Sequence, residues 1–196
     1  MNTRHILHRD FETRSTIDLT EVGAWRYAGE PNTGMWCVGY SVDDAPARIW
    51  IPGQPIPEEF FEAARESDWL VVAHNDQFET AIETRILAPQ YGWPIVPIER
   101  HRCTMATALA SALPAKLKTV AEVLELSVQK DDQGSRLMQQ MARPRKPRAG
   151  EDPNGIYWHD EPEKLDRLCA YCRQDVEVER ELFHRLPLLT DSEQIL

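Results

Sequence analysis

The stretch His5-Ile6-Leu7-His8-Arg9-Asp10-Phe11-Glu12-Thr13 has the composition of a first β-strand with charged residues at its end. Side chains alternate between the two faces of a strand, so Asp10 and Glu12 share one face while Phe11 points to the other. Two carboxylates a few ångströms apart repel each other unless a cation joins them, and Mg²⁺ prefers oxygen ligands of this kind. A charged strand end beside solvent would explain an isolated Asp-x-Glu equally well, so the interpretation depends on carboxylates elsewhere in the chain.

The rest of the chain alternates strand-like and helix-like patterns before helices dominate. Apolar runs predict strands at 36–42, 48–51 and 69–73, and apolar periodicity predicts helices at 57–67, 76–87, 104–113, 118–126, 135–141 and 162–186. The stretch 143–155 is rich in proline, glycine and charge, which predicts a loop. One sheet with helices packed on it, an α/β architecture, accounts for this order.

Composition restricts the class of protein. A length of 196 residues fits one domain, and a hydrophobic content of 42% suffices for a core. Apolar runs fall short of membrane-spanning length and the first residues do not resemble a signal peptide, so we expect a cytoplasmic protein that makes no use of a membrane. The formal net charge of −10 argues against a general nucleic-acid coat. It is compatible with an enzyme that meets phosphate through bound metal ions.

The long helix predicted at 162–186 carries a carboxylate on its apolar side. On a helical projection from Leu168, Asp175 falls at about −20°, in the middle of the apolar stripe. A buried carboxylate is costly without a partner, so Asp175 requires a metal ion or a core arginine. Tyr171 lies one turn earlier and leans the same way, which places its hydroxyl near whatever Asp175 binds, although core packing alone would also explain this tyrosine.

A third polar group, Asn75-Asp76-Gln77-Phe78-Glu79, directly follows the apolar run 69–73. Ligands gather near the sheet edge in the first turn after a central strand, but acidic residues also favour helix N-termini without any catalytic role. On a projection from Phe78, Glu79 falls at about 100°, on the rim of the buried stripe, and Asp76 at about 160°, facing solvent. We therefore predict that Glu79, rather than Asp76, is the functional carboxylate.

Together these groups resemble the DEDD exonuclease superfamily. Its first motif is matched by Asp10 and Glu12, its second by Asn75, Phe78 and Glu79, and its third by Tyr171 and Asp175. The tyrosine subgroup is indicated because Ala170 stands where the histidine subgroup carries its histidine. The stretches 10–15 (DFETRS), 22–28 (VGAWRYA) and 137–141 (LMQQM) resemble the proofreading domain of phage-type family A DNA polymerases. The chain departs from the best-known members at Glu79, where they have aspartate.

The resemblance implies a fold and an activity. The fold is ribonuclease H-like, with a five-stranded mixed sheet flanked by helices, over an exonuclease domain at 1–186. The activity is metal-dependent 3′→5′ hydrolysis of the terminal phosphodiester of single-stranded DNA to nucleoside 5′-monophosphates, as in proofreading during replication. The implied partners are a single-stranded DNA 3′ end and a DNA polymerase domain in the same or parent chain, to which 187–196 would begin a linker. A bacterial or phage-infected host cytoplasm is the expected location.

The resemblance also implies roles for single residues. Two divalent ions, Mg²⁺ or Mn²⁺, would be held by the carboxylates, with Asp10 bridging both ions, Glu12 and Asp175 completing the site that activates water, and Glu79 holding the second ion. Tyr171 would orient the nucleophile. The expected nucleic-acid contacts come from four further residues: Phe11, Thr13, Asn75 and Phe78. An aromatic wedge near the terminal base is expected as well, with Phe11 or Trp25 as candidates, although core packing would explain Trp25 equally well.

Two other functions remain open at the level of sequence. A ribonuclease D-like, RNA-trimming exonuclease would use the same ligands, so the motifs do not separate it from a DNA exonuclease. A catalytically dead nuclease fold would serve as a structural or DNA-binding module, but such a module is expected to have lost carboxylates that this chain retains. The basic stretch 143–148 would be able to contact a DNA backbone, or is a solvated loop that offsets the acidic surface.

Overall fold

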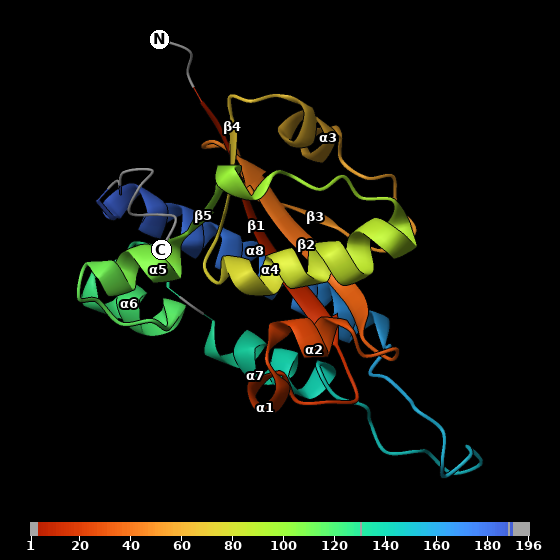
Figure 1. The fold of residues 1–196 in the computed structure, drawn as a ribbon. Coiled ribbons are helices and arrows are strands. Elements are labelled where there is room, and N and C mark those ends of the chain that lie inside the picture. Colours follow the sequence, from red (N-terminus) through yellow and green to blue (C-terminus); the bar gives the residue numbers. More distant parts are fainter. Residues whose placement is uncertain (1–3, 130, 188, 190–196) are drawn as a thin grey trace.

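A computed structural model describes residues 4–129, 131–187 and 189, and its centre is a five-stranded mixed sheet (Figure 1). The strand order is β3-β2-β1-β4-β5, formed by β1 (His5–Arg14), β2 (Gly34–Val42), β3 (Arg48–Trp50), β4 (Trp69–Ala73) and β5 (His101–Cys103). The first three strands pair antiparallel, whereas β4 runs parallel to β1 and β5 parallel to β4. The central strand β1 carries the Asp-x-Glu motif, so the motif lies in the middle of the sheet.

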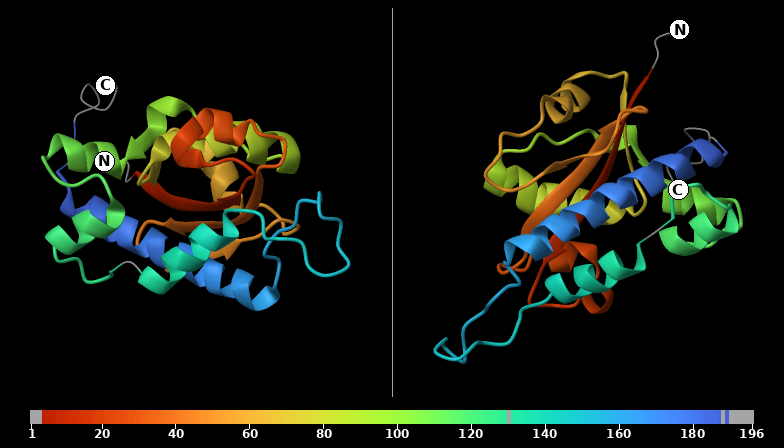
Figure 2. Two further views of the ribbon diagram at one scale, coloured as in Figure 1. Left: turned by 90° about the horizontal axis from the view of Figure 1, so that it is seen from below. Right: turned by 180° about the vertical axis from the view of Figure 1, so that it is seen from behind.

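Helices cover both faces of the sheet (Figure 2). One face packs against the long helix α8 (Pro162–Arg185), which in turn contacts α5 (Thr104–Ala110), α6 (Leu117–Val123) and α7 (Asp132–Met141). The other face is covered by α3 (Glu58–Arg65), α4 (Asp76–Ile82) and its π-helical continuation η1 (Glu83–Tyr91), with α1 (Leu19–Val22) and α2 (Ala24–Ala28) beside α4. A short 3₁₀ turn, η2 (Ile98–Arg100), leads into β5. The three layers confirm the predicted ribonuclease H-like α/β fold.

Elements with a long apolar pattern match their predictions, as does the short strand β3, whereas other short elements were not predicted. The sequence analysis missed β5, α1, α2 and η2, each of five residues or fewer and too short to show a period. The helix predicted at 76–87 changes to π-helical geometry at Glu83 and continues to Tyr91. Among the described residues, no helix combines the length and apolarity needed to cross a membrane. The tail at 187–196, expected as a linker, lies almost wholly outside the described residues.

Two glycines let helices approach the sheet and each other closely. A Cβ on Gly39 of β2 would lie 2.9 Å from Sγ of Cys172 on α8, so α8 rests directly on the strand backbone. A Cβ on Gly134 of α7 would lie 2.5 Å from Cδ2 of Tyr171, so α7 rests on the tyrosine ring. The side chain of Asp131 fixes the start of α7 by accepting hydrogen bonds from the backbone N–H groups of residues 133 and 134. These contacts set the position of α8 relative to β1.

A buried charge network fills the face of β1 opposite α8. The guanidinium of Arg9 lies 2.9 Å from Oδ1 of Asp76 and 3.0 Å from Oε1 of Glu83, and Nδ1 of His101 lies 3.1 Å from Oδ2 of Asp76. The prediction that Asp76 faces solvent is therefore wrong, since Asp76 is only 8% exposed. The apolar projection failed because it counted only apolar neighbours, whereas Arg9 supplies a buried cation. Burial works to raise the pKa of Asp76, but Arg9 and His101 outweigh it and lower that pKa.

We predict that Arg9→Met destabilises the fold by about 3–5 kcal/mol, because it leaves Asp76 and Glu83 buried without their cation. Urea unfolding followed by circular dichroism measures the change. Arg65 pairs with Glu58 at the surface and provides the control, because Arg65→Met removes an ion pair that is largely solvated. Equal midpoints for Arg9→Met and the wild type would show that the network contributes nothing.

Candidate active site

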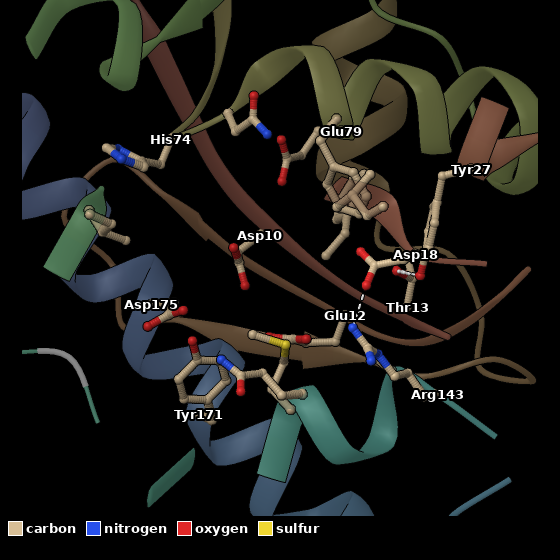
Figure 3. A pocket seen from close by; sticks show the side chains of 18 of the residues that line it. Asp10, Glu12, Thr13, Asp18, Tyr27, His74, Glu79, Arg143, Tyr171 and Asp175 are labelled. Carbon is tan, nitrogen blue, oxygen red and sulfur yellow. Dashed lines mark hydrogen bonds and ion pairs between the residues drawn. The ribbon is translucent and has the colours of Figure 1, made fainter. Parts of the chain in front are cut away.

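The three polar groups singled out in the sequence meet in one pocket of about 670 Å³. Asp10 and Glu12 come from β1, Glu79 from the first turns of α4, and Tyr171 and Asp175 from α8. Figure 3 shows Asp10 in the middle of the group, with Glu79 on one side and the α8 residues on the other. Residues separated by more than 160 positions in the chain are thus brought together by β1 lying between α4 and α8.

Asp10 and Glu12 lie on the face of β1 that meets α8, as alternation along the strand predicts. One oxygen of each carboxylate and Sγ of Cys172 all lie within 4.8 Å of one another. The thiol of Cys172 donates a hydrogen bond to the backbone carbonyl of Asp10, 3.4 Å away, and fastens α8 to the strand at this point. The register between β1 and β2 shifts between Glu12 and Thr13. Such irregularities re-aim side chains and are frequent next to active sites.

Tyr171 and Asp175 occupy successive turns of α8 and both point into the pocket (Figure 3). Asp175 is 3% exposed, which confirms its predicted place within the apolar stripe. Burial, followed by the charges of Asp175, Glu12 and Asp10, raises the pKa of the Tyr171 hydroxyl, and a hydrogen bond to Asp175 adds to this shift. The hydroxyl therefore stays protonated and acts as a hydrogen-bond donor at neutral pH.

Glu79 faces Asp10 from the opposite side of the pocket. It is 4% exposed, and burial together with the charge of Asp10 raises its pKa well above the ordinary value, although Arg9 opposes this shift. Within the described part of the chain, Oε2 of Glu79 is buried without a hydrogen-bond partner. A divalent cation in the pocket would favour the charged form of this carboxylate.

The donor set fits a hard divalent ion. Asp10, Glu12, Glu79 and Asp175 offer carboxylate oxygens, the ligands that Mg²⁺ and Mn²⁺ prefer. The buried Oε2 of Glu79 supports this assignment, because a polar atom left without a partner in the protein is one that a metal ion or its bound water would satisfy.

The four residues predicted to touch nucleic acid all line the pocket: Phe11, Thr13, Asn75 and Phe78. Phe11 is 4% exposed and belongs to the main core, so it contributes to the pocket wall from the core. Oγ1 of Thr13 lies 2.9 Å from the Tyr27 hydroxyl, which ties β1 to α2. Asn75 stands at the N-cap position of α4, and its side chain makes no capping hydrogen bond there.

Trp25, the other candidate wedge, does not line this pocket. Its ring is 43% exposed on α2, so core packing does not explain it either. Other pocket residues were given no role in the sequence analysis: Ile17, Asp18, Leu19, Tyr27, His74, Leu117, Arg136, Met138, Gln139, Gln140 and Ala142. The pocket residues on α7 could have been found from the sequence, because the stretch 137–141 resembles phage polymerases. Arg143 belongs to the basic stretch 143–148 and forms an ion pair with Asp18 at the pocket mouth (Figure 3).

Melting temperatures measured with and without metal at two pH values test the raised pKa of Glu79. Because its folded-state pKa is raised above the ordinary 4.5, ionisation of Glu79 destabilises the folded state as pH rises from about 4.5 through the folded pKa. We predict that Glu79→Gln melts about 2–4 °C above the wild type in EDTA at pH 8, with a smaller difference at pH 5. Mg²⁺ should raise the wild-type melting temperature more than that of the variant.

Differential scanning fluorimetry at both pH values, with EDTA or Mg²⁺, measures these shifts. The exposed Glu163 on α8 gives a matched Glu→Gln control, whose melting temperature should follow the wild type. A Glu79→Gln variant that melts below the wild type at pH 8 in EDTA would contradict the account of this pocket.

Known proteins resemble this chain in sequence and in fold. The chain is 34% identical over 181 residues to a DNA polymerase of Bacillus phage SP02, a match that covers 90% of the chain and 27% of that polymerase. Escherichia coli RNase D, described as an exoribonuclease involved in structured RNA processing, superposes on 91% of the chain and 39% of its own, with a TM-score of 0.52 and 10% identity. Brucella melitensis NrnC covers 92% of the chain and 72% of its own, with a TM-score of 0.49 and 15% identity.

No protein-family profile matches the chain. The sequence match spans about a quarter of the phage polymerase, and the likeness to RNase D concerns the fold. Two parts of the resemblance are nevertheless confirmed: the likeness to RNase D confirms the ribonuclease H-like fold, and the chain is similar in sequence to a phage DNA polymerase over 90% of its length.

Proposed function

We propose that this chain is a metal-dependent 3′→5′ exonuclease that hydrolyses the terminal phosphodiester of single-stranded DNA to give nucleoside 5′-monophosphates. The observation that carries the proposal is the convergence of Asp10, Glu12, Glu79, Tyr171 and Asp175, from three separate segments, on one pocket. Four carboxylates gathered in one partly buried hollow repel each other, and divalent cations bound between them would offset that repulsion.

Each of the four carboxylates would be a ligand of one or both metal ions. Asp10 is central and would contact both ions, Glu12 and Asp175 would complete one site, and Glu79 would complete the other. Divalent ions held there, Mg²⁺ or Mn²⁺, would lower the pKa of a bound water and stabilise negative charge on the phosphate. Tyr171, whose raised pKa keeps its hydroxyl protonated, would orient the attacking water by donating or sharing a hydrogen bond.

DNA is favoured over RNA as the substrate. The chain is 34% identical to a protein named a DNA polymerase, whereas its likeness to the exoribonuclease RNase D, at 10% identity, concerns the fold alone. An activity of this kind beside a polymerase removes misincorporated nucleotides, so we propose a proofreading role in DNA replication. The partner would be a DNA polymerase region in the same or parent protein. A catalytically dead module is disfavoured because all four carboxylates and the tyrosine line the pocket.

The direct test is digestion of a 5′-labelled single-stranded DNA in Mg²⁺, in Mn²⁺ and in EDTA, beside RNA of the same sequence. We expect a ladder that shortens from the 3′ end with either metal, no cleavage in EDTA, and slower cleavage of RNA. Asp10→Ala and Asp175→Ala should each lower the rate by roughly 10³-fold or more, because both remove charge at the reacting phosphate. Asp166→Ala, an exposed position on the same helix as Asp175, should keep the wild-type rate.

Faster cleavage of RNA than of DNA would move the proposal to the RNA-trimming class. Wild-type rates in Asp10→Ala or Asp175→Ala, with the melting temperature confirming a folded protein, would remove the pocket as the site of hydrolysis.

Tyr171→Phe separates water orientation from metal binding. Removing a hydroxyl that positions a reactant, and leaving the carboxylates in place, should slow hydrolysis about 10- to 100-fold. Isothermal titration with Mn²⁺ should give the wild-type affinity, because the hydroxyl is not among the proposed ligands. A collapse of Mn²⁺ affinity in this variant would make Tyr171 a structural or ligating residue instead.

A further inference from the structure

A second, smaller hollow of about 310 Å³ adjoins the catalytic pocket. We call it the Trp25 groove, and define it by its lining residues: Trp25, Asn75, Asp76, Gln77, Thr80, Ile98, Cys103 and Met105. Asn75 lines both hollows, so they meet at the N-terminus of α4. Two elements also contribute to both sides. Helix α2 places Tyr27 in the pocket and Trp25 in the groove, while α4 places Phe78 and Glu79 in the pocket and Gln77 and Thr80 in the groove.

The exposure of Trp25 has no explanation in the packing of the fold. Tyr27 takes the core position on α2, whereas the Trp25 ring is 43% exposed. Ile98, which also lines the groove, is 61% exposed. The exposed side chain of Arg85 on η1 places its guanidinium 6.0 Å from the Trp25 ring centroid. The groove therefore combines an exposed aromatic ring with a cation and two amide side chains. This combination suits a ligand that has a planar part and an anionic part.

We propose that the Trp25 groove holds nucleotides upstream of the scissile end of a single strand, with one base stacked on Trp25. This inference rests on the proposed exonuclease function and names the path of its substrate. The catalytic pocket, at about 670 Å³, accommodates only the end of a strand, so the chain of nucleotides must leave it. The Asn75 boundary offers an exit that leads directly onto Trp25.

The chemistry of the groove suits this occupant. Base stacking on an aromatic ring is tolerant of sequence, as an enzyme that removes any nucleotide requires. The side chains of Asn75 and Gln77 are exposed and able to donate to base or phosphate oxygens, and Arg85 is a cation within reach of a phosphate. Because the chain carries a net charge of −10, general attraction of the DNA backbone is weak. Stacking is therefore expected to supply much of the affinity for a longer strand.

The test compares oligo-deoxythymidylates of two and ten nucleotides, with hydrolysis measured in Mn²⁺ and binding of the decamer measured in EDTA by fluorescence anisotropy. The wild type should have a higher kcat/KM on the decamer than on the dinucleotide. In Trp25→Ala the ratio of the two should fall about tenfold, with a similar loss of decamer affinity, and Trp25→Phe should restore most of both. Leu109→Ala changes an apolar side chain that is 54% exposed and lies outside both hollows, and serves as the control.

Each outcome has a separate meaning. A Trp25→Ala variant with wild-type decamer affinity and an unchanged ratio would overturn the proposal, and would assign the groove to a protein segment instead. An equal loss on dinucleotide and decamer would also overturn it, since the effect would then come from the catalytic pocket. If the wild type binds the decamer without cleaving it, and the Trp25→Ala variant binds it more weakly, the proposed hydrolysis fails and the groove remains a nucleic-acid site.

Discussion

The fold holds the carboxylates of Asp10, Glu79 and Asp175 together in one buried pocket, although their like charges repel. Asp10 lies on the central strand of the sheet, with Glu79 facing it from α4 and Asp175 beside it on α8. Burial and the charge of Asp10 raise the pKa of Glu79, so the folded protein keeps these groups close at an energetic cost. The surrounding fold supplies the rigidity to do so. Gly39 lets α8 rest on the β2 backbone, and Cys172 ties α8 to the carbonyl of Asp10.

The two faces of β1 carry different groups of charged side chains. On the α4 face, Arg9 neutralises Asp76 and Glu83 with a cation from the protein itself, and this network anchors the first turns of the helix that presents Glu79. On the α8 face, one oxygen each of Asp10 and Glu12 and Sγ of Cys172 lie within 4.8 Å of one another. A cation of the protein thus holds the start of α4 in place on one face, and on the other face we propose that a cation from solution joins the carboxylates.

Much of this arrangement was predictable from the sequence, because long periodic patterns determine which side chains share a face. Alternation along 5–13 predicted that Asp10 and Glu12 lie together, and the phase of α8 predicted a buried Asp175. Asp76 was predicted wrongly, since a projection of apolar residues cannot reveal a buried arginine on another strand. The three residues of β5 carry no period, and the groove beside Trp25 arises only when α2, α4 and η2 meet. Tertiary contact, rather than local pattern, decides such features.

We propose that the carboxylates of Asp10, Glu12, Glu79 and Asp175 form one divalent-metal centre. X-ray diffraction from crystals soaked in Mn²⁺, recorded for anomalous scattering, would locate the ions. Anomalous density is expected between Asp10 and the other three carboxylates in the wild type, and weaker density in crystals of Glu79→Gln. An absence of anomalous density from this pocket at millimolar Mn²⁺, with the carboxylates ordered, would contradict it.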